Sequence, residues 1–297
     1  MNDPYNPYSP YGGGQPQNAY GGSPHHPQGQ WGQQPQPQPQ GQWGQHPGYL
    51  QQQAAYGGVG SYAQQQGGYV DDSQVVAAQA SPQARAKFIE RTYLHLAGAI
   101  ILFVLLSTGA QYVPGVQNLS IMMLESWMIV LLAFMGVSFV ADRWSRNATS
   151  LPMQYFGLLL YTVATVVIFI PLIAIALSIP EFGSSGIMTA GVTTLAIFAG
   201  LTGYVFITKK DFSFMRGMLS VLTMGAVGLV FGSIFFGFNL GLLFSVGMVV
   251  LAGGYILYYT SNVLHHYRTT QHVAAALALF SAVALLFWYI LRIFMRR

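Results

Sequence analysis

Long apolar runs fill the sequence after about residue 81. A helix that crosses a bilayer needs roughly 20 mostly apolar residues, and its backbone polar groups must be satisfied within the segment. About seven runs meet this length, and short connections with Pro, Gly, Asn or charge separate them. The sequence therefore predicts an all-α membrane protein, a bundle of about seven transmembrane helices. The runs are Leu94–Val113, Ile121–Ala141, Tyr155–Ile179, Ile187–Thr208, Met218–Phe236, Leu240–Tyr259 and Val273–Phe294.

The composition excludes an ordinary soluble domain. Only 7% of the residues are charged and 53% are hydrophobic, whereas soluble domains carry about 25% charged residues. The chain has no cysteine, which excludes disulfides, thiolate metal sites and a cysteine nucleophile. Its net charge is +4, but the basic residues stand singly or in small groups at the ends of apolar runs. Because they form no stripe, we expect no nucleic-acid partner.

Residues 1–80 differ sharply from residues 81–297. The first segment consists largely of Gln, Pro, Gly and Tyr, and its only charges are Asp3, Asp71 and Asp72. Such a composition cannot bury enough apolar surface to offset the entropy of ordering, so we predict a disordered low-complexity arm. One interpretation is a functional arm, either a weak multivalent one or a ligand for proline-recognising domains. The other is a solvated tail without a specific partner.

The basic residues also predict the topology, because Lys and Arg concentrate on the cytoplasmic side of short loops. They place the N-terminal arm and the even-numbered turns in the cytoplasm. The C-terminal arginines break the pattern, since seven crossings put them outside. Short loops and absent cysteine favour a bacterial inner membrane, with an internal eukaryotic membrane as the alternative. The residues that indicate the cytoplasmic side are Arg85, Lys87, Arg91, Arg143, Arg146, Lys209, Lys210, Arg216 and Arg268. The residues that break the pattern are Arg292, Arg296 and Arg297.

A membrane enzyme or ion pathway usually carries ionisable groups inside its spans. None of the eight acidic residues falls in the middle of a run. Glu125 comes nearest, about one turn into the second run, and we interpret it as a side chain that reaches the interface. No G-x-S-x-G motif occurs, and the histidines lie near span ends. We therefore predict that the chain is not an enzyme and has no cofactor or metal site.

One polar cluster stands at the end of the sixth run. It is either an interfacial aromatic belt with a polar cap or the lining of a cytoplasmic vestibule. The sequence does not decide between these two interpretations. The vestibule residues are Tyr255, Tyr258, Thr260, Asn262, His265 and His266.

Four segments together resemble the Bax inhibitor-1 family, the transmembrane Bax-inhibitor-motif or lifeguard-like proteins. The resemblance covers roughly Lys87 to Arg297. It rests on the order and spacing of the segments rather than on any one of them. They are Thr208-Lys-Lys-Asp-Phe-Ser213, Ile256-Leu-Tyr-Tyr-Thr-Ser-Asn262, Ala275-Ala-Leu-Ala-Leu-Phe280 and Leu286-Phe-Trp-Tyr-Ile-Leu-Arg292.

The resemblance implies seven helices with the last one central, and a pH-sensitive Ca²⁺ leak through two aspartates on helices six and seven. Here the matching positions hold Tyr259 and Ala282. A neutral phenol and a methyl group cannot share a proton or attract a cation as two carboxylates do. The resemblance thus implies the fold, while the family's di-aspartate pH sensor is missing.

Two functions follow as hypotheses. The first is a non-enzymatic modulator of partner membrane proteins or of stress and cell-survival pathways. The alternative is a leak channel for Ca²⁺, or a proton-linked one, with altered gating by His265, His266 and His272, because imidazole titrates near neutral pH. We favour the modulator because the carboxylates are absent. The expected partners are the lipid bilayer and other membrane proteins, and Ca²⁺ stays open.

Overall fold

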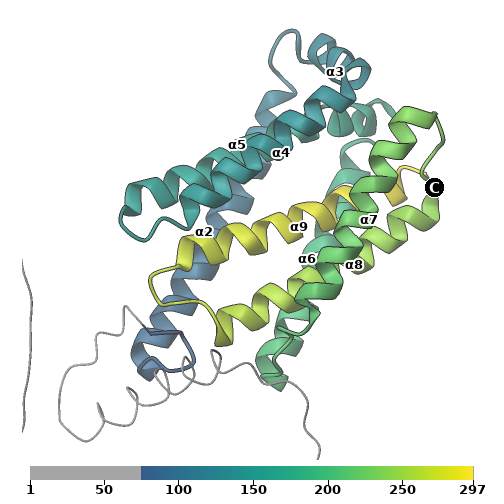
Figure 1. The fold of residues 1–297 in the computed structure, drawn as a ribbon. Helices are drawn as coiled ribbons and strands as arrows, with labels where there is room; N and C mark the ends of the chain where they lie inside the picture. Colours follow the sequence, from purple (N-terminus) through teal and green to yellow (C-terminus); the bar gives the residue numbers. More distant parts are fainter. Residues whose placement is uncertain (1–74, 297) are drawn as a thin grey trace, which may run out of the picture. The chain divides into compact units, whose positions relative to one another are not determined.

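The structure is a computed structural model that describes residues 75–296. This part of the chain forms eight α-helices and no β-strand (Figure 1). Seven of the helices are long and apolar enough to cross a membrane, which confirms the predicted fold class. The helices are α2 Pro82–Ala110, α3 Val116–Glu125, α4 Trp127–Ser145, α5 Leu151–Ser178, α6 Gly183–Thr208, α7 Met215–Phe236, α8 Leu242–His265 and α9 His272–Phe294.

The predicted arm, residues 1–80, lies outside the described residues except at its end, so its disorder stays a prediction. Residues 75–80 contact the connection between α8 and α9. The backbone N–H of Ala77 donates to the carbonyl of Tyr267 at 2.8 Å, and Val76 forms an isolated bridge with Arg268. Ala77 is fully buried. This end of the arm is therefore fixed to the membrane domain.

The second predicted span needs correction. The structure divides the run from Ile121 to Ala141 between α3 and α4, and Ser126 leaves the helical region at φ −106°, ψ 31°. Glu125 is the last residue of α3 and is exposed, so it does not lie inside a span. The polar pair Glu125-Ser126 interrupts the apolar run, and α3 becomes a separate short helix beside the end of α4 (Figure 1).

The first helix begins earlier than its apolar run. Ser81 caps it, because its hydroxyl oxygen accepts a hydrogen bond from the N–H of Ala84 at 3.3 Å, and Pro82 fits the first helical position. Three basic residues that were expected before the helix therefore lie in its first turns, namely Arg85, Lys87 and Arg91. Hydropathy marks only the part that a bilayer covers, whereas capping residues set where a helix begins.

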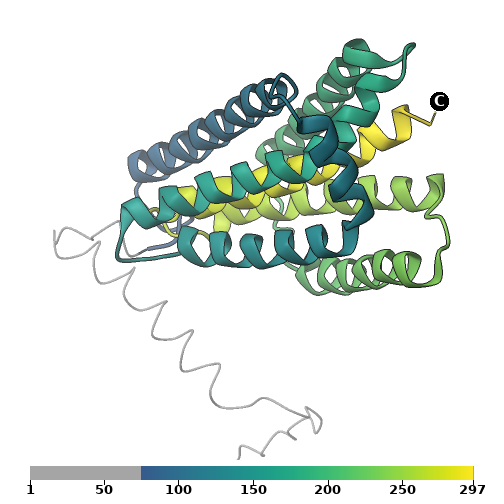
Figure 2. The same cartoon turned by 90° about the horizontal axis from the view of Figure 1, so that it is seen from above.

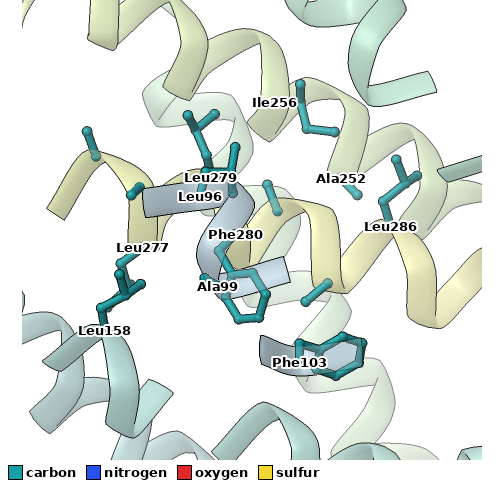
Figure 3. Packing of buried hydrophobic residues seen from close by; sticks show 14 of the residues in the cluster. Leu96, Ala99, Phe103, Leu158, Ala252, Ile256, Leu277, Leu279, Phe280 and Leu286 are labelled. Atoms are coloured by element: carbon teal, nitrogen blue, oxygen red, sulfur yellow. The ribbon is translucent and has the colours of Figure 1, made fainter. Parts of the chain in front are cut away.

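Helix α9 occupies the centre of the bundle. Its 18-residue window of highest hydropathy is 72% buried, against 11% for α7. Helices α2, α5, α6 and α8 pack on it, and Figure 2 shows it among the other helices. Figure 3 shows Leu279 and Phe280 of α9 beside Leu96 of α2, and Leu286 of α9 beside Ala252 of α8. This arrangement confirms that the last helix is central.

Two helix pairs flank α9. Helix α4 packs mainly on α5, and α7 packs mainly on α8. In the first pair the backbones approach closely at Gly157, where an added Cβ atom lies only 2.6 Å from the carbonyl oxygen of Ala141 and the amide nitrogen of Ser145. Small residues permit such approaches between membrane helices. The α4–α5 contact therefore requires glycine at this position.

The bundle has two ends, which we name for what they carry. The histidine end holds His265, His266 and His272 with the connections 146–150, 209–214 and 266–271. The C-terminal end holds the connections 179–182 and 237–241, the end of α9 and the chain terminus marked in Figure 1.

Candidate functional site

The two positions that the family resemblance matches to the aspartate pair line one cavity. Tyr259 lies on α8 and Ala282 on α9, and both contribute to a cavity of about 700 Å³ beside α9. Ala282 is buried, with 2% of its surface exposed, and Tyr259 is partly buried. Motif matching along the sequence therefore selected two residues that share a space in the fold, although they are far apart in sequence.

The cavity walls combine aromatic rings, hydroxyl groups and one cation. Helices α4, α5, α7, α8 and α9 contribute to it, as does the α7–α8 connection. No Asp or Glu is among its lining residues, and Arg292 is the only charged one. The aromatic lining residues are Trp127, Phe134, Tyr161, Phe169, Phe238, Tyr255, Tyr259, Trp288 and Tyr289.

Packed rings and a hydrogen bond fix Tyr259 and its neighbours. The rings of Tyr255 and Tyr259 stack with centroids 5.4 Å apart, and the ring of Tyr258 lies 5.2 Å from that of Tyr259. The Tyr255 hydroxyl lies 2.7 Å from the Thr223 hydroxyl on α7. These contacts join α7 to α8 and gather three phenol rings around position 259.

The residues predicted to line a vestibule do not share one space. Tyr255 and Tyr258 both pack against the smaller core cluster of α7, α8 and α9, but only Tyr255 lines the cavity. Thr260 is fully buried and Asn262 is 9% exposed, inside the helix packing. The remaining two, His265 and His266, lie at the histidine end and contact the α6–α7 connection.

Asp211 ties the α6–α7 connection to the end of α8. Its carboxylate accepts hydrogen bonds from the Ser261 hydroxyl at 3.2 Å and the Ser213 N–H at 2.8 Å. Nε2 of His266 lies 3.2 and 3.1 Å from its two oxygens. Desolvation raises the pKa of Asp211, but the hydrogen bonds and His266 outweigh it and bring this pKa from 3.8 to about 2. Asp211 is therefore ionised at neutral pH.

His272, the third histidine proposed for gating, has different neighbours. It is 4% exposed at the start of α9. Its ring lies 5.1 Å from the ring of His95 and 6.4 Å from that of Tyr155, by centroids. Within residues 75–296, no three His, Cys, Asp or Glu side chains gather where they could hold a metal ion.

The sequence did not reveal Arg292, Trp127 and Trp288 as parts of this site. Arg292 and Trp288 belong to the family segment Leu286–Arg292, and Arg292 breaks the charge pattern of the loops, but neither observation places them at a cavity. The two tryptophans lie on α4 and α9, and their rings stack with centroids 5.9 Å apart. No motif joins positions so distant in sequence, because their neighbourhood arises only when α4 packs beside α9.

Comparison with known proteins agrees with the fold and the motifs. Residues 85–297 match the family described as inhibitor of apoptosis-promoting Bax1. An uncharacterized protein of Pseudomonas aeruginosa is 31% identical over 56% of this chain and 72% of its own. Mouse protein lifeguard 4 is 23% identical over 72% of this chain and 87% of its own. Bax inhibitor 1 of Schizosaccharomyces pombe is 25% identical over 73% of this chain and 79% of its own. As its motifs indicated, the chain belongs to the Bax inhibitor-1 family of multi-pass membrane proteins.

Proposed function

We propose that this chain is a non-enzymatic modulator of partner membrane proteins and does not leak Ca²⁺ through an aspartate pair. The observation that carries the proposal is the cavity lined by Tyr259 and Ala282, which has no carboxylate and a single charge, that of Arg292. The names of two relatives, Bax inhibitor 1 and lifeguard 4, suggest partners in cell-survival pathways.

Elementary electrostatics opposes a Ca²⁺ path here. Ca²⁺ in proteins takes 6–8 oxygen ligands, among which carboxylates supply the compensating charge. Without such charge, moving an ion into a low-dielectric space is very unfavourable. A neutral phenol at 259 and a methyl group at 282 supply none, and the guanidinium of Arg292 repels a cation.

Reconstitution into liposomes with a trapped Ca²⁺ indicator tests the proposal. We expect the natural chain to give no flux above empty vesicles at acidic or neutral pH. The double variant Tyr259→Asp with Ala282→Asp is expected to gain a pH-dependent leak, whereas the neutral control Tyr259→Asn with Ala282→Asn is not. Size-exclusion profiles establish that each variant is folded. A pH-dependent Ca²⁺ flux through the natural chain contradicts the proposal.

The modulator role itself requires a partner. Full-length protein purified in mild detergent after brief crosslinking is expected to carry the same membrane proteins in repeated preparations. An unrelated seven-helix protein expressed at the same level serves as the control. A preparation that recovers nothing reproducible above this control argues against modulation.

We also propose that the histidine end faces the cytoplasm, with the bacterial inner membrane as the favoured location. Most Lys and Arg of the membrane domain belong to this end, which fits the positive-inside rule. The arginines at the other end have structural roles, since Arg292 lines the cavity and Arg296 donates to the carbonyl of Leu240 at 3.3 Å.

Because the chain has no cysteine, Thr270→Cys and Asn239→Cys allow a direct test of this orientation. An impermeant thiol reagent on intact cells is expected to label only position 239, and labelling of 270 alone refutes the orientation.

The second candidate function is a leak channel with altered gating. The observation in its favour is the contact of His266 with Asp211, in which an imidazole and a carboxylate join two connections at the histidine end. This candidate predicts flux through the natural chain that differs between acidic and neutral pH. It further predicts that His266→Gln removes the difference while His95→Gln retains it.

A further inference from the structure

We propose that the cavity beside α9 binds one acyl chain of an anionic phospholipid, whose phosphate contacts Arg292. The shape of the cavity, its access route and its charge each support this occupant. The inference concerns Arg292 and the aromatic walls, and it does not depend on whether the chain modulates partners or conducts ions.

The cavity lies where a lipid chain can enter from the side. It is lined by residues of both α4 and α7, yet α4 packs mainly on α5 and α7 mainly on α8. Figure 1 shows α4 and α7 apart, with α9 between them. The outer faces of both helices carry exposed large apolar side chains, such as Ile129 of α4 at 68% and Val221 of α7 at 69%. Both helices are candidate membrane spans, so this side borders the acyl chains of the bilayer.

The dimensions and walls suit a slender apolar ligand. A volume of about 700 Å³ falls within the range of about 300–1,000 Å³ that is common for small-molecule sites. Trp127, Phe134, Phe169 and Trp288 line it with flat aromatic faces. A chain of methylene groups packs well against such rings.

The charge at the C-terminal end selects the headgroup. Arg292 lies in the last turn of α9 and makes no ion pair among the described residues. Arg296 donates to the carbonyl of Leu240, another lining residue, so a second guanidinium lies close to the cavity, and no carboxylate is among the lining residues. Arginine matches phosphate oxygens with two parallel hydrogen bonds. The occupant that complements these guanidinium groups is therefore an anion.

Selectivity must come from the headgroup rather than from the chain. A lipid tail gains no hydrophobic free energy by leaving other tails for an apolar cavity, since both surroundings are equally apolar. The difference between lipids then rests on Arg292. We expect a preference of about fivefold for phosphatidylglycerol over phosphatidylcholine, the factor that one arginine near an anionic headgroup supplies.

Tryptophan fluorescence tests the inference directly. Of the five tryptophans, replacement of Trp31, Trp43 and Trp144 by Phe leaves Trp127 and Trp288, both on the cavity wall. The otherwise full-length protein is reconstituted in phosphatidylcholine with a small fraction of lipid brominated on its acyl chains. Bromine quenches indole at contact, so quenching reports a chain in the cavity. We expect brominated phosphatidylglycerol to quench at a fivefold lower mole fraction than brominated phosphatidylcholine.

Matched variants separate the cavity from the surrounding lipid. Arg292→Gln is expected to abolish the preference, Arg292→Lys to retain part of it, and Arg143→Gln at the other end to leave it unchanged. Ala284→Phe, which fills the cavity, should weaken quenching by both lipids. The inference is overturned if the two lipids quench equally in the starting protein, if Arg292→Gln keeps the preference, or if the preference survives Ala284→Phe.

Discussion

The substitution Gly157→Ala tests the packing of α4 on α5, because it adds a single methyl group where the two helices approach closely. The added Cβ atom lies 2.6 Å from the Ala141 carbonyl oxygen and the Ser145 amide nitrogen, whereas ordinary contact begins at 3.4 Å. The shortfall of about 0.8 Å involves backbone atoms on both sides. No rotamer change can relieve it, so the two helices must separate.

The separation lowers stability by about 1–3 kcal/mol, as is typical of overpacking in a dense interior. Gly136→Ala in α4 is the matched control, because nothing lies within 4 Å of its added Cβ atom. There the substitution raises stability by about 0.5–1 kcal/mol through the helix preference of alanine. Both variants gain this helix preference, so the difference between them isolates the steric contribution at Gly157.

Thermal unfolding in detergent, followed by fluorescence-detected size exclusion, measures the effect. We expect Gly157→Ala to unfold about 2 to 12 °C below the natural chain, given roughly 2–4 °C per kcal/mol for a domain of this size, and Gly136→Ala to unfold at or above it. Equal midpoints for the two variants refute the close approach of α4 and α5 at this position.

Two further predictions concern the histidine end and the core. Because the pKa of Asp211 is lowered to about 2 from 3.8, its interactions stabilise the fold above about pH 4, and this contribution is lost as the pH falls toward 2. In thermal scans between pH 5 and pH 2, the stability of Asp211→Asn should decline less than that of the natural chain. The difference should be under about 1 kcal/mol, because the carboxylate is half exposed. An identical decline in both proteins contradicts this role of Asp211. Phe280→Ala should lower the unfolding midpoint by the equivalent of about 3–5 kcal/mol, because Phe280 is 1% exposed. Leu243→Ala, at an 86% exposed position, should leave the midpoint nearly unchanged, and a comparable loss there contradicts the placement of the core.

Hydropathy predicted the seven spans because a bilayer leaves the backbone few alternatives to a helix. It predicted helix ends less well, since Ser81 and Pro82 extend α2 beyond its apolar run. Hydropathy also predicted one span where the structure has α3 and α4. A polar pair such as Glu125-Ser126 is equally compatible with a continuous helix whose polar side chains reach the interface.

Hydropathy alone does not identify the central helix. Helices α7 and α9 have similar mean hydropathies of 2.1 and 2.3, yet their most apolar windows are 11% and 72% buried. Lipid tails and the protein interior are equally apolar, so the composition of a span carries little information about which of them surrounds it. Family motifs supplied this information, as they did for Tyr259 and Ala282. The role of Arg292 depends on the tertiary packing around the cavity, and no local pattern indicates it.

The central place of α9 has a consequence for biosynthesis. Helices leave the ribosome in chain order, and α9 follows all six other spans. Those spans must therefore enter the membrane before α9, on which several of them later pack, has been synthesised. During this interval, α2, α5, α6 and α8 expose to lipid, or to one another, the faces that finally pack on α9. A half-made chain has its outer helices before its core, so insertion and assembly of this bundle are separate events in time.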